Sequence, residues 1–600
     1  MDKRLILFLL GFLLYSNTFL HDFVLDDAIV LSENRFVQQG VNGLNDIFFK
    51  DSFAGFFGVE GKDQLVAGGR YRPLSLATFA LEVSLFGLQP ISGHILNALL
   101  YGILGIVIFL IFKIFIKNQS TAFWMTAIFL AHPIHTEVVA NIKGRDEILA
   151  MLFSVLALWM VLKKKSTMLA AILFFIGFLA KENAITFLAI IPISIWFLHN
   201  QGIKKIGISM IPFFVSTSVF LWIRFQIVGG FDGEMSSELL NNPFITIDSG
   251  NYRIMDFGEK MAIIFVTLAK YLQLLAFPFP LTHDYYPMFF KQEGWSTIEP
   301  WIGLFLNVGL LVLGILGLVK KRVWGYGITF YFIALSIVSN VFFPVGTNMS
   351  ERFIFLPSLG IIFLSSYLKK PFWIGITVVF GIITIKRNFD WKDNFTLFSK
   401  DIEVSANSAK LNNALGGVLI ENAIKSNPPN QAELKRAENY LDRATQIHPR
   451  YKNAYLLKGN ARFYMGDYEN AILAYQNALD LDPGYVEARG NLGLAYRDAG
   501  RNYGEKLGNI QKAKEFLTLA YQLIPDDYEV LRLLGVAEGM SGNNIDALNW
   551  FEKAILLLPE DAYANLNLAT AYFNLGQEER GNFYLNKAKS INPSIISGTR

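Results

Sequence analysis

The sequence predicts an all-α protein in two parts, a polytopic membrane bundle followed by a solenoid of short helical repeats. Of the 600 residues, 52% are hydrophobic, and the long uncharged runs that mark membrane helices fall in the first 400. After about residue 406 a 34-residue period begins. There is no cysteine, which excludes disulfides, thiolate catalysis and cysteine-ligated zinc. A formal net charge of +3 gives no support for nucleic acid as a partner.

Residues 1–390 form the predicted membrane domain. The first apolar run, 5–20, follows Lys3 and Arg4 and is not followed by a cleavage site, so we expect a retained helix with a cytoplasmic amino end. Residues 21–90 are then an external loop. Ten more apolar runs follow, at about 91–112, 121–134, 147–162, 168–180, 184–198, 206–227, 301–319, 324–343, 353–367 and 371–385. The expected total is about 11 spans.

The basic residues set the orientation of these spans. Lys and Arg clusters occupy every second loop, such as 163–165 and 320–322, as expected for cytoplasmic loops. This topology places everything after about residue 386 on the non-cytoplasmic side. One segment, 259–279, is apolar but interrupted by Lys270, and both of its flanking loops must be external. We therefore expect an interfacial or re-entrant helix there.

With this topology, most of the charged residues outside the basic loops fall on the non-cytoplasmic face. Charged groups are costly near lipid, so their convergence predicts a polar chamber for an ionic substrate. The candidate site residues are Asp26, Asp27, Arg72, His135, Glu137, Arg145, Glu147, Lys181, Glu182, His283, Asp284, Glu351 and Arg352.

The composition of this chamber suits transfer of a sugar from a lipid phosphate to a hydroxyl. That reaction needs a base for the acceptor and positive charge for the departing phosphate. Asp26 or Asp27 fits the base, and Arg145, Lys181 and Arg352 are phosphate candidates.

Each of these assignments has a structural alternative. The Asp pair would also cap the following helix. The cations would pair with neighbours in the sequence: Arg145 with Asp146 or Glu147, Lys181 with Glu182, and Arg352 with Glu351.

A metal site is a weaker possibility. His132, His135 and Glu137 have suitable side chains, but their spacing is not that of the zinc-protease helix, so a hydrogen-bonded structural or substrate-orienting role is favoured. We assign no metal ligand and leave a divalent cation open. No glycine-rich phosphate loop occurs, so nucleotide hydrolysis has no support.

The carboxyl-terminal part is periodic. Prolines at 449, 483, 525, 559 and 593 are separated by 34, 42, 34 and 34 residues, and 34 is the tetratricopeptide period. Small residues keep the same register, with Gly459, Gly493 and Gly535 at the close-contact position of the first helix. Tyr475 and Phe551 are expected to fill the space between paired helices. The repeats are predicted over 406–600, after a linker at 391–405.

Taken in order, these motifs resemble a known family. The motifs are Asp26-Asp27, Tyr71-Arg72-Pro73-Leu74, His132-Pro133-Ile134-His135-Thr136-Glu137, Gly144-Arg145-Asp146-Glu147, Lys181-Glu182-Asn183, Ser350-Glu351-Arg352-Phe353, and Arg387-Asn388-Phe389-Asp390-Trp391 before the repeats. This order is similar to that of the transmembrane and tetratricopeptide-repeat O-mannosyltransferases, which have the C-type membrane glycosyltransferase fold. Leu25 departs from the pattern, because an aromatic residue often precedes the acidic pair there.

The resemblance implies transfer of a sugar, mannose in characterised relatives, from a polyprenyl- or dolichyl-phosphate donor to Ser or Thr of a protein, with inversion. Asp26 is the expected acceptor base. The implied partners are the lipid-linked sugar donor as co-substrate, membrane lipid, and an acceptor polypeptide bound by the repeats. The expected location is a membrane, with the bacterial inner membrane favoured, the endoplasmic reticulum left open, and the repeats on the non-cytoplasmic side. The alternatives are a non-catalytic membrane scaffold that recruits partners through its repeats and a lipid-linked glycan ligase.

Overall fold

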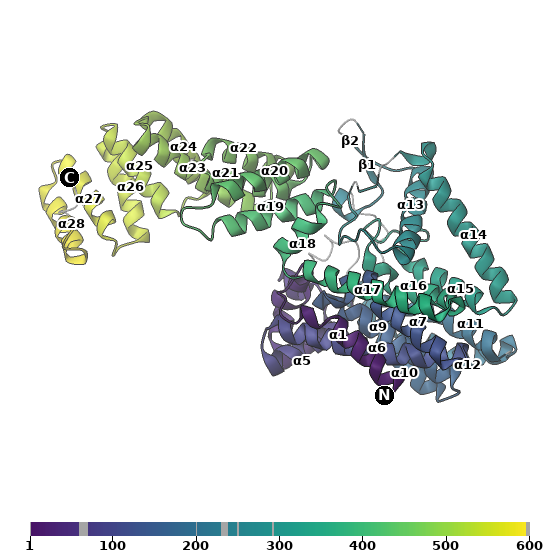
Figure 1. Ribbon diagram of the computed structural model, residues 1–600. Helices are drawn as coiled ribbons and strands as arrows, with labels where there is room; N and C mark the ends of the chain where they lie inside the picture. The colour runs from purple at the N-terminus through teal and green to yellow at the C-terminus, as the bar shows by residue number, and fades with distance from the viewer. Residues whose placement is uncertain are drawn as a thin grey trace. The chain divides into compact units, whose positions relative to one another are not determined.

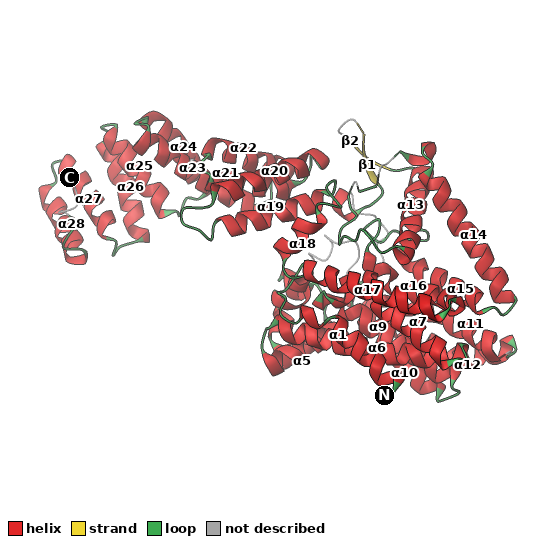
Figure 2. Cartoon of the chain, in the orientation of Figure 1, coloured by secondary structure: helices red, strands yellow, loops and turns green. Residues whose placement is uncertain are grey.

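The computed structural model describes residues 2–58, 70–199, 201–229, 238–248, 251–287, 289–290 and 293–595. The described chain is helical almost throughout, with one two-stranded antiparallel ribbon (Figure 2). It divides into two compact units, Met1–Leu411 and Asn412–Arg600. The all-α class with a tetratricopeptide solenoid is thereby confirmed.

The first unit contains eighteen of the labelled α-helices and the ribbon. Its helices are α1 (Lys3–Leu14), α2 (Arg35–Gln38), α3 (Leu44–Phe49), α4 (Ala54–Phe57), α5 (Pro73–Phe86), α6 (Pro90–Phe115), α7 (Gln119–Ala131), α8 (Thr136–Val139), α9 (Arg145–Leu162), α10 (Thr167–Ala180), α11 (Phe187–His199), α12 (Ile203–Val228), α13 (Phe257–Ala276), α14 (Glu299–Val319), α15 (Val323–Leu335), α16 (Phe355–Ile362), α17 (Lys370–Asp390) and α18 (Asn394–Asp401). The ribbon pairs β1 (Ile245–Asp248) with β2 (Asn251–Ile254) in the register Ile245 to Ile254.

A bundle of apolar helices forms the centre of this unit. Helix α1 packs on α6 and α7, α6 packs on α9, and α9 packs on α10 (Figure 1). Glycine permits the closest of these approaches, because a Cβ added to Gly102 of α6 would lie 2.9 Å from the Phe8 carbonyl oxygen of α1. Close backbone contact of this kind is typical of helices that pack in a membrane.

Five helical segments of the described chain are long and apolar enough to cross a membrane. They are α6, Glu182–His199, α12, α14 and α17; shorter apolar helices cover Pro73–Phe86, Thr167–Ala180 and Val323–Val338. Several apolar helices are what a multi-pass membrane protein requires. Helix α13, which covers most of the expected interfacial segment 259–279, is not among the five.

The predicted external loop 21–90 is largely helical. Its described part includes α2 to α5, which pack around a small apolar core containing Phe36, Ile47, Leu76 and Phe79. Ile142, from the segment before α9, joins the same core. This packing holds the acidic pair and the Arg72 segment against the rest of the first unit.

The second unit is a solenoid of paired helices (Figure 1). Its helices are α19 (Ala409–Ala423, which begins in the first unit), α20 (Gln431–Ile447), α21 (Lys452–Tyr464), α22 (Tyr468–Leu481), α23 (Val486–Arg501), α24 (Ile510–Leu523), α25 (Tyr528–Met540), α26 (Asn544–Leu557), α27 (Ala562–Asn574) and α28 (Glu578–Ile591). The glycine register predicts the close contacts. A Cβ on Gly459 would lie 2.4 Å from the Tyr475 ring, and one on Gly535 would lie 2.5 Å from the Phe551 ring.

The boundary between the units differs from the sequence expectation. The predicted linker, 391–405, contains helix α18, whose Asp401 carboxylate pairs with Arg387 of α17 at 2.6 Å. Because this buried ion pair ties the segment to the bundle, the segment belongs to the first unit. The division falls between Leu411 and Asn412.

Candidate active site

The two neighbouring aspartates lie in a tight turn between α1 and a short helical segment at 28–32. Leu25, just before them, has a φ of +53°, a left-handed conformation that is uncommon for a residue with a side chain and that often marks functional sites. The two carboxylates have different surroundings. Asp27 is fully buried, whereas the Asp26 side chain is 35% exposed.

Asp27 is bound entirely to backbone groups. Its Oδ2 accepts a hydrogen bond from the Val24 N–H at 2.9 Å, and its Oδ1 accepts one from the Lys143 N–H at 2.7 Å. It does not cap the following helical segment through its side chain. Burial raises the pKa of Asp27 to about 7, against the opposing effect of the two N–H donors. This residue joins the acidic turn to the segment before α9.

Asp26 faces a cluster of cations. Arg352 donates from Nη1 to Asp26 Oδ2 at 3.0 Å, so its expected alternative pairing with Glu351 is wrong. Burial alone would raise the pKa of Asp26, but the charges of Arg352, Lys143 and Arg70 hold it well below its usual range. The carboxylate is therefore ionised at neutral pH.

Glu137 fixes the backbone that carries Arg352. Its carboxylate accepts the Arg352 N–H at 2.8 Å and the Ser350 hydroxyl at 2.8 Å. It is buried, and the Arg352 Nε lies 3.6 Å from its other oxygen. A buried carboxylate with three donors around it is a rigid anchor, so Glu137 sets the position of the guanidinium that reaches Asp26.

A second carboxylate, that of Asp146, lies close to three cations of the cluster. Arg72 lies 2.8 Å from its Oδ2, Lys143 lies 3.3 Å away and Lys181 lies 4.0 Å away. Burial and the nearby positive charge of Arg352 lower the pKa of Lys143 to about 7. Lys143 can therefore change its charge near neutral pH.

The remaining predicted residues of this region extend the network. Arg72 also pairs with Glu182 at 3.0 Å, and Lys181 pairs with Glu147 rather than with the neighbouring Glu182. The expected local pairing of Lys181 is therefore wrong, because its partner comes from another helix. Four charged residues from three chain segments are held here, and only Glu182 among them keeps about a third of its side chain exposed.

Arg145 is placed away from the cluster. It is completely buried and pairs with Glu82 at 2.8 Å, so the expected pairing with Asp146 or Glu147 is wrong. Its Nε donates to Asn97 at 2.8 Å, and its guanidinium stacks on the Phe79 ring. With these contacts made, the Arg145 side chain has no exposed surface on which to meet a phosphate.

His132 and His135 of the predicted chamber each make hydrogen bonds to different partners. His135 is buried between the Tyr101 hydroxyl at 2.8 Å and Ser358 at 3.0 Å, while His132 meets the Leu275 carbonyl at 3.0 Å. In the described ranges, no group of three or more His, Cys, Asp or Glu side chains could hold a metal ion. Asp26 is surrounded by cations and Asp27 is bound by backbone N–H groups, so this pair does not fit a divalent cation.

The other predicted residues lie in a neighbouring cluster built from the 282–286 loop. His283 pairs through Nδ1 with Asp401 at 2.7 Å. Glu351 accepts hydrogen bonds from the Thr282 N–H and the Tyr285 hydroxyl, both at 2.7 Å. Burial raises the pKa of Glu351 to about 8, so this carboxyl is mostly protonated at neutral pH. Asp284 accepts from the Ser408 hydroxyl and from the Tyr286 N–H.

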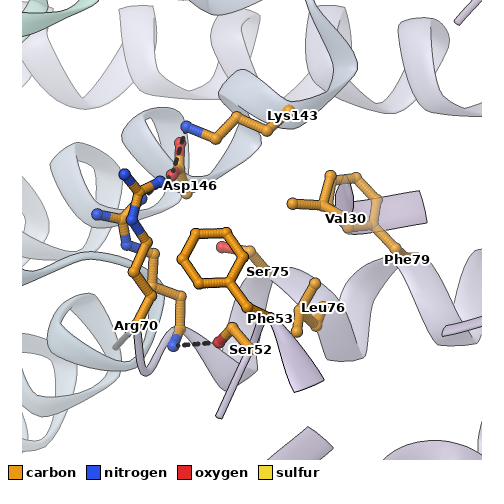
Figure 3. A pocket seen from close by; sticks show the side chains of 10 residues that line it. Val30, Ser52, Phe53, Arg70, Ser75, Leu76, Phe79, Lys143 and Asp146 are labelled. Carbon is orange, nitrogen blue, oxygen red and sulfur yellow. Dashed lines mark hydrogen bonds and ion pairs between the residues drawn. The ribbon is translucent and has the colours of Figure 1, made fainter. Parts of the chain in front are cut away.

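A pocket opens beside the cation cluster. Figure 3 shows Arg70, Lys143 and Asp146 on its polar side and Phe53, Leu76 and Phe79 on its apolar side. The Arg70 guanidinium stacks on the Phe53 ring at 5.0 Å and makes no side-chain hydrogen bond or ion pair with any residue the structure describes. The pocket therefore offers a positive charge that makes no direct ion pair with any described residue, next to apolar surface.

The sequence patterns do not single out Lys143 as a site residue, nor Asp146 as more than an ion-pair partner. They place Arg70 among the charged residues of the expected non-cytoplasmic face but give it no role. Lys143 directly precedes the Gly144-Arg145-Asp146-Glu147 motif, and that proximity is the available signal. Lys143 reaches the cluster and Arg145 does not because their side chains point in different directions. The spacing of residues along the sequence does not predict these directions.

Comparison with known proteins supports the same two parts. Tetratricopeptide-repeat family models match residues 459–500 and 562–595. "Protein O-mannosyl-transferase TMTC3" of Mus musculus is 25% identical over 533 residues, covering 79% of this chain and 54% of that protein. "Protein O-mannosyl-transferase F38B6.6" of Caenorhabditis elegans is 28% identical over 470 residues, covering 75% of this chain and 63% of that protein.

The resemblance to the transmembrane and tetratricopeptide-repeat O-mannosyltransferase family is thereby confirmed. The chain spans about half the length of the mouse and human TMTC3 proteins it matches. Among solved structures, the tetratricopeptide-repeat protein YrrB, described as having an unusual peptide-binding site, is 23% identical with a TM-score of 0.26, over 33% of this chain and 94% of that chain.

Proposed function

We propose that this protein is a membrane O-mannosyltransferase that moves mannose from a polyprenyl-phosphate donor to Ser or Thr of a polypeptide on the non-cytoplasmic side. The observation that carries this is the setting of Asp26, an ionised, partly exposed carboxylate among three cations. A base next to concentrated positive charge is the combination that sugar transfer from a phosphate requires. The names of the relatives supply the sugar and the protein acceptor.

In this mechanism Asp26 accepts the proton of the acceptor hydroxyl. The hydroxyl oxygen attacks the anomeric carbon of the sugar from the face opposite the phosphate, so the bond to the phosphate oxygen breaks with inversion. The polyprenyl phosphate leaves with the bonding electrons. Asp26 binds Arg352 through Oδ2, and no described residue donates to its Oδ1, so it is the carboxylate of the pair with an oxygen available for this proton.

Three cations would stabilise the departing phosphate. Arg352 offers a guanidinium fork, and Arg70 makes no direct ion pair with any described residue although Asp26 and Glu182 act on its charge. Lys143, which lies 3.3 Å from Asp146, adds a point charge. The apolar wall of the pocket beside them, which includes Phe53 and Phe79, suits a lipid-linked donor. Lys181 and Arg72 would not bind the phosphate directly, because they are paired with carboxylates. Lys181 pairs with Glu147, and Arg72 pairs with Glu182 and Asp146.

The repeats would bind the acceptor polypeptide. Tetratricopeptide solenoids present an extended surface on which a peptide can lie, and this solenoid follows the membrane unit directly. A lipid-linked glycan ligase would have no use for such a surface, and a scaffold would have no use for an ionised base among cations.

The decisive experiment uses the full chain in lipid nanodiscs with radiolabelled mannosyl-phosphoryl-polyprenol and a Ser/Thr-rich peptide. We expect label in the peptide with the wild type, none with Asp26→Asn, and wild-type transfer with Asp22→Asn, an exposed aspartate four residues earlier. In cells, mass spectrometry of exported proteins should show a hexose on Ser or Thr that disappears with the gene. Full transfer by Asp26→Asn would refute the assignment of the base.

A further inference from the structure

A cation outside the phosphate cluster lies at the start of α19. Lys410 is half-buried, and its Nζ lies 4.9 Å from the centre of the Tyr286 ring. The residues before it are fixed to the same loop, because Ser408 donates to the Tyr286 carbonyl at 3.0 Å and Ser405 donates to the Asp284 carbonyl at 2.7 Å. Lys410 is therefore held in place by its backbone and by an aromatic face.

Among the described residues, the Lys410 ammonium makes no hydrogen bond and no ion pair within 4.0 Å. The carboxylates whose charges act on it, including Asp284 and Asp26, are engaged elsewhere. Asp284 accepts from Ser408 and Tyr286, and Asp26 accepts from Arg352. A half-buried ammonium that makes no ion pair is costly unless an anion joins it.

The surroundings of Lys410 separate it from the donor side. Arg70 and Lys143 come from the segments before α5 and α9 and line the pocket with the apolar wall, whereas Lys410 comes from α19 and rests on the 282–286 loop. The charges of Arg70 and Lys143 lower the pKa of Asp26. The charge of Asp26 in turn acts to raise the pKa of Lys410, against the effect of burial. Lys410 is therefore a cation on which the charge of the base acts and which does not line the donor pocket.

The geometry points to Lys410 as a specificity residue that binds a carboxylate of the acceptor polypeptide next to the Ser or Thr that receives the sugar. This rests on the proposed function, since it assigns the acceptor side of the same site. An acidic side chain is the anion that a polypeptide offers, and Lys410 lies in the first turn of α19. The protein then prefers acceptors with Asp or Glu beside the modified hydroxyl.

The test uses the full chain in nanodiscs and three peptides that differ only at the residues flanking one Thr: Glu, Gln or Lys. We expect the wild type to show a KM for the Glu peptide about two- to fivefold below that for the Gln peptide, the size of one partly solvated ion pair. Lys410→Glu should reverse the order and favour the Lys peptide. The control, Lys400→Glu, changes an exposed lysine of α18 and should keep the wild-type order.

Two readouts keep the outcomes apart. The donor KM should stay the same in Lys410→Glu; a rise in donor KM without any change in peptide preference would assign Lys410 to the donor and overturn the inference. Equal KM values for the three peptides in the wild type would also overturn it. Fluorescence anisotropy of the labelled peptides measures the same preference without catalysis. If the wild type transfers no sugar, the proposed function fails while the binding order still decides the role of Lys410.

Discussion

Asp26 and Asp27 are neighbours in the sequence, yet their surroundings predict opposite consequences for the same substitution. Asp26→Asn removes a proton acceptor from a partly exposed position and leaves Arg352 anchored through its backbone to Glu137. Asp27→Asn removes one of two oxygens that accept backbone N–H groups in a fully buried site. The first change should therefore affect catalysis and the second should affect folding.

The magnitudes follow from those contacts. Loss of a general base lowers kcat by roughly 100- to 10,000-fold. The ion pair that Asp26→Asn breaks is partly solvated, so the free energy of unfolding should change by about 1 kcal/mol at most. In Asp27→Asn the new NH2 group faces a backbone N–H, and a buried unsatisfied donor costs about 1–3 kcal/mol. Little of that cost is lost charge, because the pKa of Asp27 is about 7.

The assay measures both quantities on each variant. Initial rates of mannose transfer give kcat, and intrinsic tryptophan fluorescence in nanodiscs gives the unfolding temperature, with exposed Asp22→Asn as the matched control. We expect Asp26→Asn to lose kcat at a wild-type unfolding temperature, and Asp27→Asn to unfold at a lower temperature. The reasoning is refuted if Asp26→Asn keeps its kcat while Asp27→Asn, equally stable to heat as the wild type, abolishes transfer.

Three further results are expected. Because Lys143 has a pKa near 7, kcat/KM for the donor should fall as the pH rises above about 7, and Lys143→Arg, which keeps its charge, should move the fall to higher pH. Glu351 has a folded pKa of about 8 against an ordinary 4.5, so its contribution to stability is complete below pH 4.5 and disappears as the pH rises through 8. The unfolding temperature should accordingly fall between pH 5 and 8, and less steeply in Glu351→Gln, which keeps the acceptor oxygen. Finally, Glu82→Gln should destabilise the fold by about 3–5 kcal/mol, because it leaves the buried Arg145 without a counter-charge. Replacing both residues by Met should restore most of that stability. An unchanged melting curve for Glu82→Gln alone would contradict the buried pair.

The repeats are predictable from the sequence because their packing is local. Gly459 and Tyr475 are 16 residues apart, and each repeat buries its small and aromatic residues against its neighbours in the chain. The period and register of the repeats therefore predict directly which residues of neighbouring helices make contact. The helices of the segment 21–90 are harder to predict, since α2 to α4 are four to six residues long and depend on packing against α5 and Ile142.

The site is only partly predictable, for the opposite reason. Spacing placed Asp26, Glu137 and Arg352 in one chamber, and they do meet there. Spacing cannot assign partners for the other cations, because those partners are distant in the chain. Arg145 pairs with Glu82, 63 positions earlier, and Lys181 pairs with Glu147, 34 positions earlier. A buried charge takes the partner that desolvation allows, which need not be its neighbour in the sequence.

The Asp26–Arg352 ion pair links the two halves of the proposed reaction. While Arg352 holds Asp26, the carboxylate is a weak base, because the pKa that makes it ionised also makes it reluctant to take a proton. A donor phosphate competes for the same guanidinium, which binds an anion through a planar fork. As Arg352 turns toward the phosphate, the positive charge that lowers the pKa of Asp26 is partly neutralised, and Asp26 becomes a stronger base. Glu137 keeps the Arg352 backbone fixed throughout, so only the side chain moves. In the proposed reaction the base would thus be strongest when the sugar donor is in place, which would keep the site from activating a hydroxyl that has nothing to attack.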